Sequence, residues 1–246
     1  MEKELLLSVM PGVEQYSNKI EEVKNWIEQV LDMALIDFIM MSSVFKKYHQ
    51  FAQQPVPHEV ADRVSSSVKK LQYMDFLSQK LTHIVQLNHE IEKAAIHAHS
   101  NNTTIDQAGF IFKLNYMQAT VAKTEFLLTT DALRQGLHDL HDHIISVTKL
   151  DFHEGAYFSH TGEIEERLEC IIYTLNEMQK ERCAETSSHV LNIEHQAQKL
   201  ANAYTMKSER FVLTWLLRHP HTTATELIHQ YMQEGIEQVE EEIDLF

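Results

Sequence analysis

The sequence predicts an all-α fold, a long antiparallel four-helix bundle with short C-terminal helices. The chain of 246 residues contains only 6 Gly and 4 Pro, so it has few of the breaks that a turn-rich sheet fold requires. Apolar residues recur at steps of three and four along most of the chain, which is the spacing of one helix face. The breaks separate four patterns of about forty residues, and helices of that length would pack over on the order of 60 Å.

The first long helix is expected from Val13 to about Gln53, after a short lead that ends at Pro11-Gly12. Its apolar positions step by three and four and predict one buried face. They are Val13, Tyr16, Ile20, Val23, Trp26, Ile27, Val30, Leu31 and Leu35. Pro55 and Pro57 end the pattern, and Pro57 suits the first turn of the next helix.

Two further helices of similar length follow. The second is expected from Pro57 to about Ser100, and the polar run Asn101–Thr104 predicts a loop after it. The third is expected from about Gln107 to Leu150. Its apolar positions are Phe110, Leu114, Met117, Val121, Phe126, Leu133, Leu137, Leu140 and Ile144.

The fourth long helix is expected from about Glu163 to Ala203, and the tail differs from it. A short apolar helix, Ser208–Leu217, should end at His219-Pro220-His221, and a last helix should begin near Ala224, with Thr223 or Thr225 as its cap. The sequence therefore predicts a four-helix bundle over residues 1–205 and a C-terminal helical segment over residues 206–246.

Composition excludes some classes of partner. There are 21 Lys and Arg against 36 Asp and Glu, a net charge of −15, and such a surface repels the phosphate backbone of nucleic acids. The two cysteines, Cys170 and Cys183, do not form a Cys-x-x-Cys pair and are typical of a reducing compartment. We find no apolar run of about 18 residues and no signal-peptide core, so a cytoplasmic protein without a membrane span is expected.

The second helix carries the main candidate site. Asp75 and Gln79 stand one turn apart, so both side chains emerge from the same helix face, and His83 continues this polar stripe. The opposite face is apolar and consists of Met74, Leu77, Leu81, Ile84 and Val85. The stripe is either a solvated surface or a binding face.

The segment Leu71–Ile84 resembles the active-site helix of the CheZ family of chemotaxis phosphatases, in which Asp-x-x-x-Gln follows a Gln and an aromatic residue. Here these are Gln72, Tyr73, Asp75 and Gln79. The resemblance implies that Gln79 orients a water for in-line attack on the aspartyl phosphate of a response regulator, while Asp75 pairs with a lysine of the receiver domain. It also implies no cofactor of the chain's own, because Mg²⁺ arrives with the receiver.

The C-terminal end is the second candidate site. It has no Lys or Arg after Arg218, and four apolar residues in its acidic last stretch share one helix face. These residues are Ile236, Val239, Ile243 and Phe246. The last six residues, Glu241–Phe246, which include Asp244 and Leu245, resemble the acidic, Phe-ended peptide with which CheZ binds its regulator, so we expect a docking helix. The alternative is a terminal helix that packs on the bundle.

Two weaker patterns remain. Glu194, Gln198 and the Lys-Leu pair after them repeat the spacing of Asp75 and Gln79, either as a decayed second site or by chance. His138 and Asp142 stand one turn apart, as do Asp139 and His143, a spacing that can hold a metal between helices. No matching run occurs on another helix, so we expect solvated histidines and no bound metal.

The resemblance to the CheZ family implies a hydrolase of chemotaxis signalling, a protein phosphatase that acts on a phosphorylated, CheY-like response regulator. Gln79 and Asp75 are the expected catalytic residues. The expected partner-binding residues are Gln72 and the six named tail residues. A homodimer is compatible with this function. Two alternatives stay open, a non-catalytic helical scaffold and a His-rich metal-binding bundle.

Overall fold

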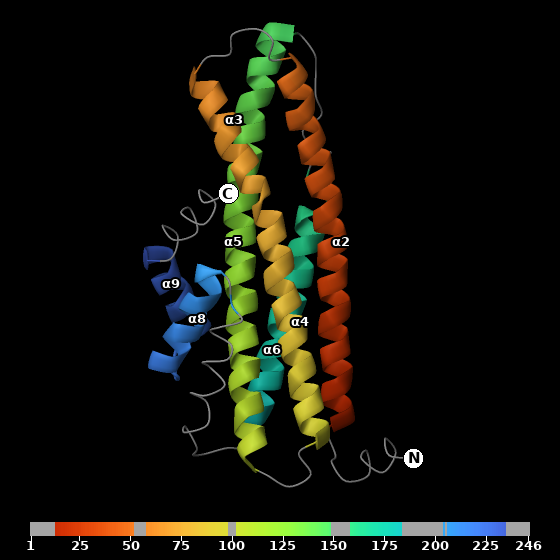
Figure 1. The fold of residues 1–246 in the computed structure, drawn as a ribbon, viewed down its shortest axis with the longest axis vertical. Coiled ribbons are helices and arrows are strands. Elements are labelled where there is room, and N and C mark those ends of the chain that lie inside the picture. Colours follow the sequence, from red (N-terminus) through yellow and green to blue (C-terminus); the bar gives the residue numbers. More distant parts are fainter. Residues whose placement is uncertain are drawn as a thin grey trace.

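The computed structural model describes residues 13–51, 58–97, 102–148, 158–183, 204 and 206–234. Within these ranges the fold is all-α, and no strand occurs in them (Figure 1). The helices are α2 (Val13–Phe51), α3 (His58–Leu71), α4 (Tyr73–His97), α5 (Asn102–Thr148), α6 (Thr161–Cys183), α8 (Lys207–Arg218) and α9 (Ala224–Glu234).

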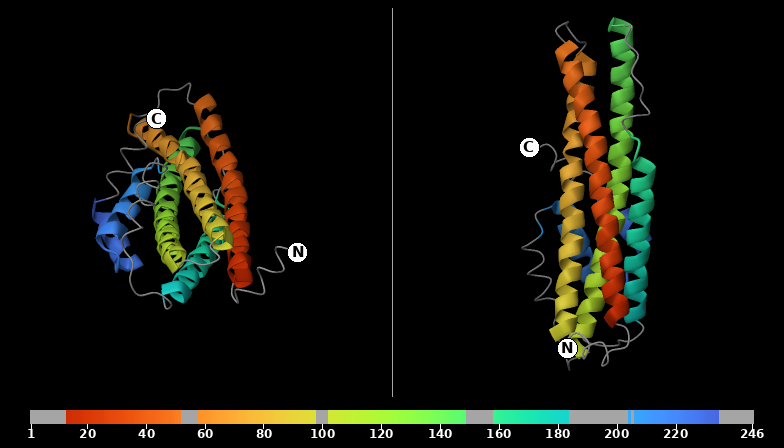
Figure 2. Two further views of the ribbon diagram at one scale, coloured as in Figure 1. Left: turned by 60° about the horizontal axis from the view of Figure 1, so that its bottom comes forward. Right: turned by 90° about the vertical axis from the view of Figure 1, so that its right-hand side faces the viewer.

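Helices α2, α4, α5 and α6 lie side by side, and consecutive ones run in opposite directions (Figures 1 and 2). Contacts join α2 to α4, α4 to α5, α5 to α6 and α6 back to α2, so each of the four touches two neighbours. Helix α3 packs mainly on α5, and α8 and α9 lie against the outer side of α5. Short connections place sequential helices next to each other, as expected for helical proteins.

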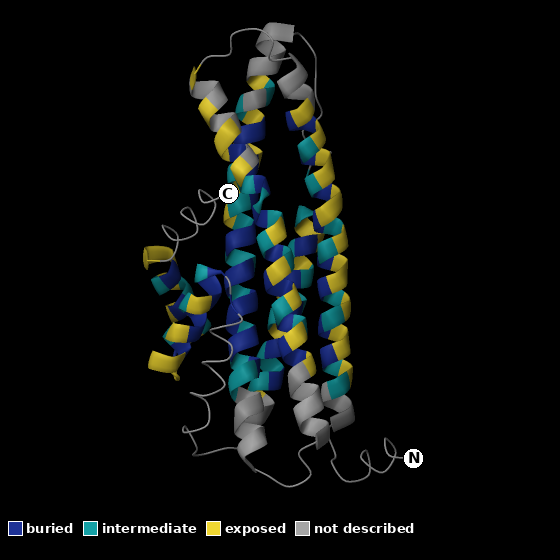
Figure 3. Ribbon diagram, viewed as in Figure 1, coloured by how far each residue is buried: buried dark blue, intermediate teal, exposed yellow. Residues whose placement is uncertain are grey.

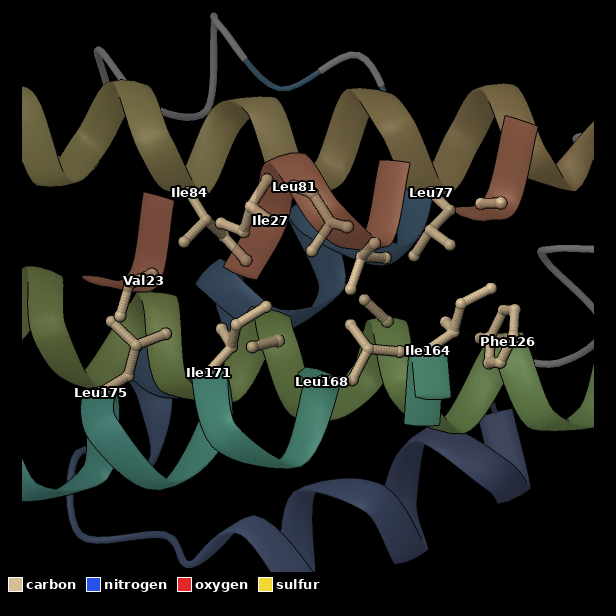
Figure 4. Packing of buried hydrophobic residues seen from close by; sticks show 14 of the residues in the cluster. Val23, Ile27, Leu77, Leu81, Ile84, Phe126, Ile164, Leu168, Ile171 and Leu175 are labelled. Carbon is tan, nitrogen blue, oxygen red and sulfur yellow. The ribbon is translucent and has the colours of Figure 1, made fainter. Parts of the chain in front are cut away.

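The main core lies between these four helices. Leu77, Leu81 and Ile84 of α4 point toward α6, where Leu168 and Ile171 meet them (Figure 4). All five are almost fully buried. Removing such side chains from water contributes about 1.5–3 kcal/mol each, so the apolar faces that the spacing predicts are what hold the helices together.

A second cluster fixes the C-terminal helices. Val212, Leu213 and Leu216 of α8 and Leu227 and Tyr231 of α9 are buried. They share one apolar cluster with residues of α4 and α5, namely Leu87, Leu114, Met117 and Val121. Buried residues therefore cover α5 on this side as well as on the main core side (Figure 3).

The predicted second helix is wrong in one respect, because it consists of two helices, α3 and α4. They meet at a turn at Gln72, where the Gln72 N–H donates to Lys69 O at 3.0 Å and the Asp75 N–H donates to Gln72 O at 3.0 Å. Neither Gly nor Pro marks the break, so the local sequence does not indicate it. Immediately after the turn, Tyr73 is buried and its hydroxyl donates to Ala122 O at 2.9 Å.

Other boundaries are close to those expected. Helix α2 agrees with the prediction, whereas α5 begins at Asn102, several residues before Gln107, so the loop expected at Asn101–Thr104 is wrong for residues 102–104. The expected continuation of the fourth helix to Ala203 and that of the last helix beyond Glu234 lie outside the described residues. Leu35 differs from the expected pattern, since it is 55% exposed rather than part of the buried face of α2.

Two helix starts are fixed by side chains. The Glu226 N–H donates to Thr223 Oγ1 at 3.2 Å and the Thr223 N–H donates to Glu226 Oε2 at 2.8 Å, a capping box for α9. Backbone hydrogen bonding from Thr223 holds the pKa of Glu226 below its usual value. At the start of α6, the His160 N–H donates to Asp37 Oδ2 at 3.2 Å, and this buried carboxylate ties α6 to α2.

Gly136 of α5 faces Ser67 of α3, and an added Cβ would lie 1.9 Å from Ser67 Oγ and 3.1 Å from Ser67 Cβ. We expect Gly136→Ala to lower the free energy of unfolding, because overpacking costs about 1–3 kcal/mol and outweighs the gain of about 1 kcal/mol in helix propensity. Chemical denaturation measures this change.

Gly162 provides the matched control, because a Cβ added there would meet nothing within 4 Å. Gly162→Ala should leave stability unchanged or raise it by up to about 1 kcal/mol. Ser67→Ala should restore part of the loss in the Gly136→Ala protein. Equal stabilities of the two glycine variants would contradict close packing of α3 on α5.

Candidate functional site on helix α4

Asp75 and Gln79 lie on the outer face of α4 and are both exposed. Neither side chain forms a hydrogen bond or an ion pair with another described residue. Gln72, in the turn before α4, is half-buried, and its Oε1 accepts no hydrogen bond from the described residues. The predicted orientation of this helix is confirmed, since Leu77, Leu81 and Ile84 are buried on the opposite face.

A buried ionic cluster lies behind this face. Lys80 of α4 and Glu125 of α5 form an ion pair, and both side chains are only 3–4% exposed. The Tyr73 hydroxyl shares its one proton between Ala122 O and Glu125 Oε2, which is 3.2 Å away, and the Tyr231 hydroxyl of α9 donates to Oε1. Burial, together with the negative charge of Glu125, holds the pKa of Tyr73 well above its usual value, so Tyr73 stays a hydrogen-bond donor.

This cluster sets the rotation of α4 about its own axis. Tyr73 and Lys80 are seven residues apart, about two helical turns, so both point inward to the same carboxylate. At about 100° per residue, Asp75 and Gln79 lie roughly opposite that inward direction. Their exposure therefore follows from the inner contacts of the same helix.

His83 continues the polar stripe by one turn, but it does not face open solvent. Its Nδ1 lies 2.7 Å from Oε1 of Glu209, which is 1% exposed in the first turn of α8. The Gln118 side-chain amide of α5 donates to the backbone oxygen of Glu209 at 3.1 Å. The exposed part of the stripe thus ends where α8 begins, and Asp75 and Gln79 lie on the open side of this contact.

The electrostatics of this contact favour a protonated imidazole. The hydrogen bond with Glu209 raises the pKa of His83, and partial burial of the ring opposes this effect without reversing it. Burial and the charge of Glu209 raise the pKa of nearby Tyr204, whose ring centroid lies 5.8 Å from that of His83.

The second Asp-x-x-x-Gln segment differs from the first. Asp131 and Gln135 of α5 are exposed too, but Arg134 Nη1 donates to Asp131 Oδ1 at 3.2 Å, and Gln135 Nε2 donates to Asp139 Oδ1 at 3.2 Å. Both side chains are therefore engaged on their own helix. Of these two described segments, Asp75–Gln79 is the one whose acid and amide both lack a partner among the described residues.

Two groups of expected residues lie outside the described residues. One is the docking stretch, Ile236, Val239, Ile243, Asp244, Leu245 and Phe246. The other is the second-site pair Glu194 and Gln198. Both remain predictions from the sequence.

The histidine-rich stretch of α5 brings a His–Asp pair close together on its own helix. His138 Nε2 lies 3.8 Å from Asp142 Oδ2, and both side chains are more than half exposed. No group of three or more His, Cys, Asp or Glu residues among the described residues could hold a metal ion.

Sequence reasoning missed the residues that position α4, namely Tyr73, Lys80, Glu125, Glu209 and Tyr231. One local signal was available for two of them. Lys80 stands next to Leu81 on the apolar side of α4, and Glu125 of α5 precedes Phe126 and follows Val121 and Ala122 by about one helical turn. Charged residues in such positions are rarely buried unless they are paired.

Comparison with known proteins gave no relative. No family model, no curated protein and no solved structure matches the chain. In the helices that the structure describes, none is long and apolar enough to cross a membrane.

We predict that the His83–Glu209 contact makes stability depend on pH. Because the pKa of His83 is higher in the folded than in the unfolded protein, its contribution is fully present below the unfolded value of about 6.5. It is lost as pH rises through the higher folded pKa. The difference in melting temperature between wild type and His83→Gln should therefore shrink from pH 6 toward pH 9.

Glu209→Gln is the control for this measurement. In that background, His83→Gln should change the melting temperature by the same amount at every pH, because the ionic partner of the imidazole is gone. A wild-type difference that stays constant between pH 6 and pH 9 would contradict the assignment of this pair.

Proposed function

We propose that the chain is a CheZ-like protein phosphatase that hydrolyses the aspartyl phosphate of a response-regulator receiver domain. We further propose that its described helices belong to a long antiparallel four-helix bundle, with the C-terminal helices docked on one side. The observation that carries the proposal is the Asp75–Gln79 pair, an exposed carboxylate and an exposed amide one turn apart, both without a partner among the described residues.

The proposed reaction needs few groups from this chain. The water oxygen attacks phosphorus in line, the bond between phosphorus and the aspartyl oxygen breaks, and the products are a free carboxylate and inorganic phosphate. The receiver supplies its own lysine and Mg²⁺ for the charge that develops on the phosphoryl oxygens. Gln79 would hold the water through its amide, because positioning and exclusion of wrong geometries are a large part of phosphoryl-transfer catalysis.

Asp75 would orient the complex through an ion pair with the receiver lysine, and Gln72 would contact the receiver beside it. The carboxylate and the amide point the same way from one helix, so a folded partner can meet both at once. The inner contacts of α4 with Glu125 support this role, because a positioning group must hold its geometry before substrate arrives.

The acidic end of the chain would supply docking. The residues Ile236, Val239, Ile243, Asp244, Leu245 and Phe246 combine one apolar edge with negative charge. A basic and partly apolar patch on the receiver is the surface that such a segment fits, since opposite potentials speed encounter and a buried aromatic anchors the complex. Receiver domains of this kind act in the cytoplasm, so we place the protein there.

Gln79→Ala tests the catalytic assignment. The variant should fold with a stability within about 0.5 kcal/mol of wild type, because the residue is exposed. Its rate of phosphate release from a phosphorylated receiver should fall on the order of a hundredfold, because the water loses the group that positions it. Single-turnover release of phosphate at saturating enzyme measures this rate.

Gln135→Ala is the matched control, since it removes the same amide from an exposed helix position with the same spacing to an aspartate. It should leave the rate unchanged. Equal rates of phosphate release for wild type and Gln79→Ala would contradict the assignment of Gln79 to the catalytic site. Binding of the receiver without any acceleration of dephosphorylation would favour the non-catalytic scaffold instead.

Removal of Glu241–Phe246 tests the docking segment. We expect a higher KM for the phosphorylated receiver and a kcat close to wild type, because Asp75 and Gln79 are untouched. Raised salt should reproduce part of the KM increase in the intact protein by screening the acidic side chains. Steady-state kinetics at two salt concentrations gives both quantities.

The opposite pattern would identify a structural role for the same residues. In that case the truncated protein would melt at a lower temperature and would bind the receiver as tightly as the full chain. An unchanged affinity would therefore contradict docking, whatever the melting temperature shows.

A further inference from the structure

Helix α2 carries an exposed apolar strip on its outer side. It consists of Leu35, Ile36, Ile39 and Met40, which are 55%, 48%, 56% and 38% exposed. The other exposed large apolar residues among the described ones are spread over four helices, as Leu128, Tyr173, Leu217 and Met232. Single exposed apolar residues are normal on a protein surface, whereas a group on one helix face indicates an interaction site.

Charges flank the strip at both ends. Glu28 and Asp32 precede it and Lys46 follows it, and all three are exposed. None of the three forms an ion pair with another described residue. Glu28 and Lys46 are separated by about five complete helical turns, so they lie on one line along α2, and the strip lies between them on the same side.

The arrangement is self-complementary. Asp37 is the midpoint in sequence between Glu28 and Lys46 and lies level with the strip along α2, although its own side chain is buried on the opposite face. If two copies of α2 pack antiparallel about a twofold axis through this midpoint, the two strips meet. The Glu28 of each copy then faces the Lys46 of the other. Such an interface satisfies the rule for twofold dimers that residue i contacts j and j contacts i.

We propose that the outer face of α2 is a homodimer interface, in which two copies of this chain pack their Leu35–Met40 strips antiparallel and form two Glu28–Lys46 ion pairs. A parallel pairing is disfavoured, because it would place like charges opposite each other at both ends. A different protein could cover the strip as well. Only pairing with a second copy, however, requires opposite charges at equal distances on the two sides of the strip's centre.

The interface should be weak and dependent on concentration. Four partly exposed side chains form a small patch, and interfaces at the small end of the range are transient. Each chain also carries a net charge of −15, so the two copies repel each other except where the Glu28–Lys46 pairs form. From these two features we expect a dissociation constant on the order of micromolar or weaker.

The first experiment is sedimentation equilibrium of the full chain over a wide range of concentrations. Wild type should change from monomer to dimer within this range, and Leu35→Asp should remain monomeric throughout. Leu128→Asp is the matched control, because it places the same charge at another exposed leucine, and it should dimerise like wild type. A monomeric wild type at all concentrations would overturn the proposal.

The second experiment tests the antiparallel arrangement by charge exchange. Glu28→Lys alone and Lys46→Glu alone should each weaken dimerisation by about tenfold or more, because each places like charges at both ends of the interface. A mixture of the two variants should form a heterodimer with an affinity close to wild type, since both opposite-charge pairs are then present. The chain that carries both substitutions should also dimerise like wild type.

Other occupants of the strip give different results. If a receiver domain binds there, Leu35→Asp weakens receiver binding while wild type stays monomeric. If another segment of the chain covers the strip, Leu35→Asp lowers the melting temperature of a monomer. A heterodimer no tighter than either variant alone would contradict the twofold arrangement. None of these measurements depends on phosphatase activity.

Discussion

One buried carboxylate, that of Glu125, constrains how three of the described helices are oriented. It accepts from Lys80, Tyr73 and Tyr231, so a single group joins α4, α5 and α9. Burying an ion pair costs several kcal/mol of desolvation per ion, and the cost is offset only where the remaining lone pairs are also satisfied. Three donors meet that condition here. The cluster therefore specifies how α4 is rotated, whereas the apolar core supplies most of the stability.

The presence of the long helices could be predicted from the sequence because it depends on the spacing of apolar residues that are close together in the chain. The steps of three and four that predict α2, α5 and α6 are properties of neighbouring residues, and burial of the apolar face follows directly from them. Leu35 shows the limit of this reasoning, because it lies about 100° from buried Ala34 and so outside the core face. The turn at Gln72 shows another, since neither Gly nor Pro marks it.

The contacts that position the candidate site could not be read from spacing. Lys80 and Glu125 are 45 residues apart, Glu125 and Tyr231 are 106 apart, and His83 and Glu209 are 126 apart. Such pairs exist only once the helices have packed. The sequence therefore indicated which face of α4 is polar, but it did not indicate that His83 belongs to a contact with α8 rather than to the open part of that face.

The shape of the proposed site suits a macromolecular substrate. Asp75 and Gln79 stand on the outer face of a helix, where a small molecule would have few groups to contain it. A receiver domain brings its own metal, lysine and phosphoryl group, so its partner must add only a fixed point of contact at the attacking water. To hold the attacking water in place, the partner needs an accessible amide on a helix whose position is fixed by contacts on its other face. In α4 the inward ion pair of Lys80 anchors the helix one residue away from Gln79, and the contact of His83 with α8 joins the same helix to α8 one turn further on.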